Sequence, residues 1–280
     1  MGLPINIEDL LTGETVEWER IEFKEGWNPL EVTHSICAYA NDINNWGGGY
    51  IILGIRQENG RPILPPKGLT SLEIENIQHE LMDWCHRLHP NYFPIAEPIK
   101  YQGKMILVLW AYGGPVRPYK APDGYKDHPG GHSYYVRRFS STTKADDQEE
   151  RDLLNMSANI PYDDQTQQRS DTSDLKLPII QEYLKNVDSS LYAESESMPF
   201  ISLCRRMNII DGPDEYVKPK NIGLLMFSDD PTRYFSCAQI DIVEFENEAG
   251  DVFTEKIFKG PIHHQLQNAL IYIKNRIILE

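Results

Sequence analysis

The N-terminal part of the chain alternates between helical apolar spacing and short apolar runs. Asn28 can cap a helix that begins at Pro29, and Glu31 completes a capping box. Apolar side chains then recur at helical spacing as far as Ile43, which predicts a helix with one buried face. The apolar run 50–55 follows a triple glycine, and it predicts a strand that is covered on both sides.

The same alternation continues after this strand. A second capping box at 70–73 opens a helix that Pro90 ends. The elements expected around these helices are a charged strand over 19–24, a hairpin of strands 95–101 and 105–112, a strand over 134–139 and a helix over 145–157. This order of elements predicts an α+β domain, in which helices flank a mixed sheet.

A polar segment divides the chain into two parts. Residues 163–174 include no apolar side chain, so they cannot offset the roughly 1 to 2 kcal/mol per residue that ordering a backbone costs. We therefore expect a linker over 158–176 between a first domain, 1–157, and a second, smaller α+β domain, 177–280. In the second domain we expect helices over 179–187 and 200–207, extended segments over 222–227, 239–246 and 252–258, and a closing helix over 263–276.

Composition limits the possible functions. The net charge of −15 argues against general nucleic-acid binding, because phosphate neutralisation by Lys and Arg supplies most non-specific affinity. Any nucleic-acid site must then be local. The four cysteines lie far apart without a Cys-x-x-Cys, which predicts reduced core thiols in a cytoplasmic protein. No apolar run approaches the length of a membrane span, so no membrane partner is expected.

Several short motifs follow one another in a characteristic order. The N-terminal motifs are Glu22-Phe23-Lys24, Ala38-Tyr39-Ala40-Asn41, Gly48-Gly49, and Gly54-Ile55 with Glu58. Further short motifs follow at 117–119, 135–138, 160–163, 221–227, 231–235 and 258–261. In this order the motifs resemble the Schlafen AlbA-type domain. That domain opens many bacterial proteins described as transcriptional regulators or as divergent AAA and helicase-related proteins. One departure is Phe139, where the family usually has glycine.

This resemblance implies a nucleic-acid-binding module of a bacterial transcriptional regulator, with DNA or RNA as partner and a homodimer as a further possibility. ATP would bind only to a domain outside this chain, so we expect no cofactor and no catalytic activity here. A non-catalytic dimerisation or interaction scaffold is the alternative that the acidic charge favours.

Positive charge gathers in one part of this acidic chain. The candidate phosphate contacts are Arg117, Lys120, Lys126, Arg137, Arg138 and Lys144, together with Lys24 beside the glycine-rich turn; Tyr119, Tyr125, Tyr134 and Tyr135 lie among them. Arginine forks and stacking rings are what a nucleic-acid groove needs. The alternative is a solvated strand and loop whose charges pair with Asp123 and Asp127.

Three carboxylates support a different hypothesis. Some animal Schlafen proteins are RNA endonucleases with an acidic trio, and Glu17, Glu22 and Glu58 resemble it. Such a trio could hold a divalent cation that activates water for a metal-dependent endoribonuclease. Glu17 and Glu22 would point to opposite faces of an unbroken strand, so a turn near Glu19 is needed. The alternative is an exposed acidic edge paired with Arg20 and Lys24.

Other polar motifs predict less. The triple glycine 47–49 precedes a strand and lacks a Gly-Lys-Ser/Thr ending, which favours a tight turn over a phosphate-binding loop. The histidines have no carboxylate or cysteine set that would complete a zinc site. The serines and threonines 140–143 have no accompanying His and Asp, so nucleophilic catalysis has no support.

Overall fold

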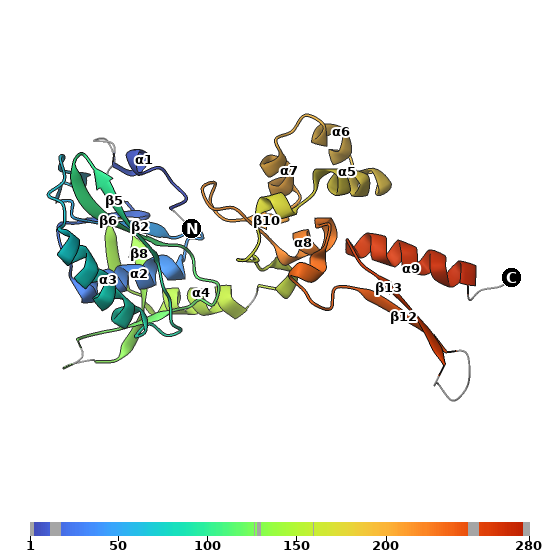
Figure 1. Ribbon diagram of the computed structural model, residues 1–280. Helices are drawn as coiled ribbons and strands as arrows, with labels where there is room; N and C mark the ends of the chain where they lie inside the picture. The colour runs from blue at the N-terminus through green and yellow to red at the C-terminus, as the bar shows by residue number, and fades with distance from the viewer. Residues whose placement is uncertain are drawn as a thin grey trace. The chain divides into compact units, whose positions relative to one another are not determined.

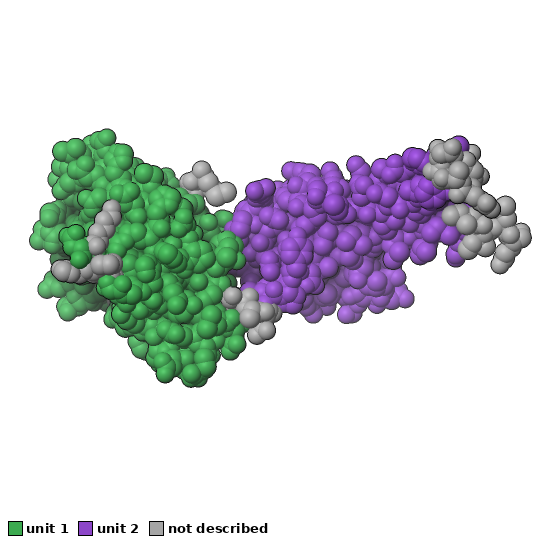
Figure 2. Space-filling view, turned by 90° about the horizontal axis from the view of Figure 1, so that it is seen from below, with its two compact units in different colours: residues 1–159, 213–216 green, residues 160–212, 217–280 purple. Residues whose placement is uncertain are grey.

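The chain forms two units in the computed structural model, which describes residues 3–11, 18–125, 127, 130–158, 160–245 and 252–276. The first unit comprises residues 1–159 and 213–216, and the second comprises 160–212 and 217–280 (Figure 2). None of the helices within the described ranges is both long enough and apolar enough to cross a membrane.

A four-stranded mixed sheet with the order β1-β2-β6-β5 lies at the centre of the first unit (Figure 1). Its strands are β1 (Ile21–Lys24), β2 (Gly49–Leu53), β5 (Ile95–Tyr101) and β6 (Lys104–Ala111). β1 and β2 pair in parallel, whereas β2 with β6 and β6 with β5 pair antiparallel. The mixed α+β sheet that the order of elements predicts is therefore confirmed.

Helices cover the sheet because its strands are apolar on both faces. Ile51 of β2 belongs to the core that includes α2 (Pro29–Asn41) and α3 (Ser71–Cys85), whereas Ile52 belongs to the core on the other face, with α1 (Ile7–Leu11). Both helix starts agree with the sequence. The Asn28 side chain accepts the N–H of Glu31, and Thr70 and Glu73 form the complete capping box.

A second sheet lies against α2. Its three strands, β7 (Lys120–Pro122), β8 (His132–Arg138) and β9 (Ser141–Lys144), follow one another in antiparallel order. A two-stranded hairpin of β3 (Gln57–Glu58) and β4 (Arg61–Pro62) and the helix α4 (Asp147–Ala158) complete the regular elements described in this unit. Buried Asn41, at the end of α2, donates to the carbonyls of Tyr119 and Tyr135 and so joins α2 to this sheet.

The second unit is smaller and mostly helical. Its helices are α5 (Leu177–Asn186), α6 (Leu191–Ser195), α7 (Phe200–Arg206), α8 (Asn221–Phe227) and α9 (Ile262–Arg276), with 3-10 turns at Tyr162–Asp164, Thr172–Asp174 and Pro231–Arg233. Its strands form two hairpins, β10 (Ile210–Asp211) with β11 (Lys218–Pro219) and β12 (Ile240–Phe245) with β13 (Phe253–Phe258). Figure 1 shows α9 beside β12 and β13.

One predicted element of the second unit is wrong. Residues 222–227 are not extended but form most of α8. A run of six residues is too short for periodicity to separate a buried strand from a buried helix. The helix places Leu224 and Phe227, three positions apart, in the same core. Gly223 allows close packing, because a Cβ there would lie 2.6 Å from the Ile209 carbonyl oxygen.

The polar segment 163–174 makes contacts that its composition does not predict. Lys220 Nζ lies 2.7 Å from Asp164 Oδ1, and Thr166 forms a bridge with Lys220. Lys218 Nζ donates to the carbonyl of buried Ser170 at 2.7 Å. Lysines 218 and 220 thus bind a segment without apolar side chains through its oxygens. The boundaries 1–157, 158–176 and 177–280 as independent domains stay a prediction.

The cysteines differ in their burial. Cys37, Cys85 and Cys204 are buried free thiols, as expected. Cys237 is exposed, so the expectation that all four are core thiols is wrong at this position. It follows the short 3-10 turn after α8, where the chain leaves the helical core.

Candidate functional site

The carboxylate of Glu19 connects three surface turns of the first unit. Its Oε1 accepts the backbone N–H of Phe139 at 3.0 Å, in the β8–β9 turn. Its Oε2 accepts from Asn44 Nδ2 at 3.4 Å, in the turn between α2 and β2. Arg138 Nη1 in turn donates to Asn44 Oδ1 at 3.2 Å. Segments that lie far apart in the sequence therefore meet at Glu19.

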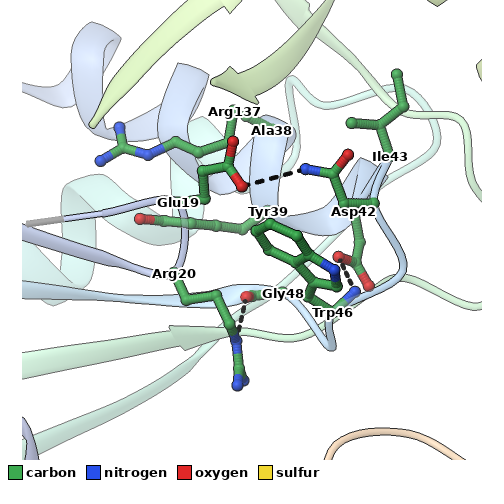
Figure 3. Close-up of a pocket in the computed structure, with 10 residues that line it drawn as sticks. Glu19, Arg20, Ala38, Tyr39, Asp42, Ile43, Trp46, Gly48 and Arg137 are labelled. Atoms are coloured by element: carbon green, nitrogen blue, oxygen red, sulfur yellow. Dashed lines mark hydrogen bonds between the residues drawn. The ribbon is translucent and has the colours of Figure 1, made fainter. Parts of the chain in front are cut away.

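The turn between α2 and β2 is fixed by a buried carboxylate. Asp42 adopts a left-handed conformation, and one of its oxygens accepts the N–H of Trp46 at 2.9 Å (Figure 3). The other oxygen accepts the N–H of Gly47, also at 2.9 Å. Gly47 and Gly48 have positive φ, and a Cβ at Gly48 would lie 2.0 Å from the Ala111 carbonyl oxygen. The glycines thus form the tight helix-to-strand turn that the sequence favours.

Three exposed aromatic residues adjoin Glu19: Trp18 precedes it in the chain, Trp46 lines the same pocket, and Phe139 donates its backbone N–H to the carboxylate. Trp18 is 45% exposed and Trp46 is 44% exposed, and their ring centroids lie 6.0 Å apart at an interplanar angle of 32°. Phe139 is 82% exposed and has a φ of 52°. We call Trp18, Trp46 and Phe139 the aromatic rim.

A small pocket lies between these turns and α2 (Figure 3). It is lined by Glu19, Arg20, Ala38, Tyr39, Asp42, Ile43, Asn44, Trp46, Gly48 and Arg137. Arg20 Nε donates to the Gly48 carbonyl at 3.1 Å, and its guanidinium also pairs with Glu215 of the same unit. Burial raises the pKa of the Asp42 carboxyl, and the Arg117 guanidinium opposes this shift.

Arg137, a candidate phosphate contact, lies in the interior. Its side chain is 5% exposed, and Nη1 lies 2.9 Å from Glu22 Oε2 and 3.0 Å from Thr142 Oγ1. Lys24 Nζ contacts the other Glu22 oxygen at 3.0 Å. Arg137 of β8 thus neutralises the buried carboxylate of Glu22 on β1. It therefore has little surface with which to contact a phosphate.

Two other candidates hold the end of α2 or stack on a ring. Arg117 Nη1 donates to the Asp42 carbonyl at 3.2 Å, and Nη2 donates to Asn45 Oδ1 at 3.0 Å. Lys120 Nζ lies 4.5 Å from the centroid of the Tyr134 ring. Lys126 lies outside the described residues.

The two remaining basic candidates lie on the β8–β9 hairpin and keep much of their surface. Arg138 Nε lies 2.8 Å from Glu149 Oε1, and Lys144 Nζ lies 3.0 Å from Asp123 Oδ1. The Lys144 side chain is 56% exposed and that of Arg138 is 39% exposed. The pairing of Lys144 with Asp123 is one that we expect if this strand and loop are only a solvated, charge-paired surface.

The acidic trio is only partly described. Glu17 lies outside the described residues, Glu22 has both oxygens paired in the interior, and Glu58 is exposed on β3. The turn needed near Glu19 is present, since Ile21 N donates to the Trp18 carbonyl at 3.1 Å. Within the described ranges, no three His, Cys, Asp or Glu side chains group in a way that could hold a metal. A cation site at this trio stays a prediction.

The sequence interpretation did not identify the two tryptophans of the aromatic rim. The signal of Trp46 is local, because it lies between Asn45 and Gly47 in the turn that follows the end of α2. A large ring in such a turn has no helix face through which to reach the core. The proximity of Trp18 has no such signal, because it depends on how β1 and β2 pair.

Comparison with known proteins identifies part of the chain. Residues 17–146 match the family described as Schlafen, AlbA_2. One similar solved structure is the DIP2311 protein from Corynebacterium diphtheriae, with 16% identity over 97% of this chain and 48% of that one, and a TM-score of 0.37. The chain thus spans about half the length of that protein.

Another similar structure is the N-terminal domain of a RecG-related protein from Nitrosomonas europaea. The identity is 23%, over 52% of this chain and 94% of that domain, and the TM-score is 0.36. No curated protein matches the chain.

Proposed function

We propose that the segment 17–146, which matches the Schlafen, AlbA_2 family, is a domain that binds nucleic acid through the β8–β9 hairpin and the aromatic rim. The net charge of −15 requires that such binding be local. The hairpin supplies two partly exposed cations, Arg138 and Lys144, and the neighbouring turns supply exposed rings.

One observation carries the proposal. Arg138 hydrogen-bonds to Asn44, and Trp46 lies two residues further along the same turn. A guanidinium that can bind a phosphate therefore contacts the turn that carries an exposed indole on which a base can stack. Arginine forks suit phosphate oxygens, and aromatic rings suit the faces of bases.

The carboxylates that now pair with these cations do not prevent phosphate binding. Glu149 and Asp123 pair with Arg138 and Lys144 from the protein side, since their side chains are only 16% and 22% exposed, whereas the cations are 39% and 56% exposed. Each cation therefore keeps an open side on which a phosphate can bind without displacing the carboxylate. Phosphate binding there also releases counterions from the nucleic acid.

The role of this domain in transcriptional regulation is inferred from the family resemblance. In this proposal the domain is the nucleic-acid-binding part of a bacterial transcriptional regulator, acting in the cytoplasm. A homodimer and an ATP-binding domain outside this chain belong to the same proposal. The metal-dependent ribonuclease remains the alternative, and no contact of the described residues favours it.

Fluorescence anisotropy with labelled single-stranded and duplex oligonucleotides tests the proposal. The variant Arg138→Ala/Lys144→Ala should bind both more weakly, and its salt dependence should be flatter by about 0.7 to 0.9 per lost phosphate contact. Lys67→Ala is the matched control. Lys67 is 54% exposed and pairs with Glu25 at 2.8 Å, much as Lys144 pairs with Asp123. Equal affinities and salt slopes for wild type and both variants would exclude this surface.

A further inference from the structure

We propose that the aromatic rim binds an unpaired nucleobase, so that the domain prefers single-stranded nucleic acid to duplex. This inference rests on the proposed function and adds the class of ligand. The exposed rings, the polar groups beside Trp46 and the fixed turns that carry them support it.

The two indoles form a stacking surface on the outside of the unit. Their centroid separation of 6.0 Å is that of rings in direct contact, so a base cannot enter between them. Each tryptophan nevertheless keeps more than two fifths of its surface exposed, as Trp18 is 45% and Trp46 is 44% exposed. A base can therefore stack on an outer face, and stacking needs a base whose own face is uncovered.

The polar groups beside Trp46 suit the edge of a base better than a phosphate. The pocket that Trp46 lines includes the carboxylates of Glu19 and Asp42, which would repel an anion. The Glu19 carboxylate can still accept further hydrogen bonds, and the amino groups on base edges are donors. In a duplex these edges are paired and the faces are stacked, so only an unpaired base offers both. A phosphate of the same strand would then bind Arg138, which does not line the pocket.

The turns that carry the rings are already fixed without a ligand. Asp42 holds Trp46 through the backbone, and Glu19 holds the N–H of Phe139. Phe139 has a left-handed φ of 52°, which costs about 1 to 2 kcal/mol for a residue other than glycine. Phe139 is 82% exposed, so it gains little from packing in the interior. Pre-ordered rings lose little conformational freedom on binding, which favours affinity.

The same features argue against a protein-docking surface. A protein interface of this kind needs a continuous apolar patch. The turns that carry the rim also carry the polar side chains Glu19, Asn44 and Arg138, which hydrogen-bond to one another and to the backbone of Phe139.

The test measures affinity for a single-stranded oligonucleotide of about 12 nucleotides, as DNA and as RNA, and for the corresponding DNA duplex. We expect the single strands to bind more tightly than the duplex. Trp46→Leu should lower single-strand affinity about tenfold and duplex affinity less than twofold, because only the unpaired base stacks. Trp46→Phe, which keeps a ring, should restore most of the loss. Phe93→Leu is the matched control, since Phe93 is 47% exposed in the loop between α3 and β5.

Other outcomes separate this inference from the proposed function. If Arg138→Ala/Lys144→Ala weakens binding and Trp46→Leu does not, the rim is excluded and the proposed function stands. Tighter binding of duplex than of either single strand also overturns the inference. If no oligonucleotide binds the wild type, both fail. Should Trp46→Leu not fold, tryptophan emission of the wild type decides, because single strands should quench it and duplex should not.

Discussion

Asp42 fixes the position of Trp46 by accepting its backbone N–H at 2.9 Å. The same carboxylate accepts the N–H of Gly47 and lies 3.7 Å from Arg117 Nη1. A buried acid at the end of α2 thus holds the turn that presents an exposed indole. This relationship connects the packing of the helix to the surface that we propose as a binding site.

The protonation of Asp42 should make stability depend on pH. Burial raises the pKa of this carboxyl in the folded state, against the opposing effect of Arg117. The folded state then binds the proton more tightly than the unfolded state, so this group's contribution to stability is present at low pH and is lost as pH rises from about 4 through the raised pKa. Asp42→Asn lacks this dependence.

The free energy of unfolding of the wild type should therefore increase relative to that of Asp42→Asn as pH falls from 7 towards about 4. Urea denaturation of both proteins at several pH values measures this difference, and the contributions of other groups largely cancel. A constant difference, or one that moves in the opposite direction, would contradict a raised pKa.

The buried pair of Glu22 and Arg137 should matter more to stability than any surface pair in this unit. Arg137→Ala leaves the Glu22 charge buried with only Lys24 beside it, and we expect a loss of about 3 to 5 kcal/mol. Arg138→Ala, which removes a partly exposed pair, should cost about 0 to 1 kcal/mol. Chemical denaturation of the two variants compares them, and similar losses would show that Arg137 is not an interior residue.

Only one of the four cysteines should react quickly with thiol reagents. Burial raises the pKa of Cys37, Cys85 and Cys204 to about 12 each, and none is accessible, whereas Cys237 is exposed. A maleimide at about pH 8 should label one thiol rapidly and the others only on unfolding. Cys237→Ser should abolish the rapid phase. Two or more rapid thiols in the folded chain would contradict the described burial.

The polar segment before α5 should be protected by Lys220. Its Nζ lies 2.7 Å from Asp164 Oδ1 and 2.8 Å from Asn208 Oδ1. Lys220→Met removes both bonds, so trypsin should cut at exposed Arg169 several times faster than in the wild type. Lys176→Met, which removes an exposed lysine that donates to Ser173 in the same segment, is the control. Equal cleavage rates in all three proteins would mean that Lys220 does not hold the segment.

Local sequence signals predicted much of the first unit. The caps at Asn28 and Thr70 act within one turn of a helix, so neighbouring residues suffice to locate them. The apolar run of β2 needs only to be covered on both faces, which any flanking helices achieve. The prediction of an extended segment at 222–227 was wrong because the run is too short to show a helical or a strand period.

The candidate site was less predictable because it depends on long-range contacts. Glu22 and Arg137 lie 115 positions apart, and nothing near either residue indicates that they pair. A basic residue in a sequence cluster can therefore face the interior, while its neighbour Arg138 on the same strand faces outward, as alternation in a strand requires. Trp18 and Trp46 meet only because β1 and β2 are parallel neighbours.

Ultraviolet crosslinking of a single-stranded oligonucleotide to the full chain tests the central claim most directly. Mass spectrometry of the digested complex locates the attached nucleotide without any substitution. We predict crosslinks in the peptides that contain Trp18 or Trp46, and in the β8–β9 turn at Phe139. Crosslinks confined to the second unit, or absent from all three of these turns, would contradict the account.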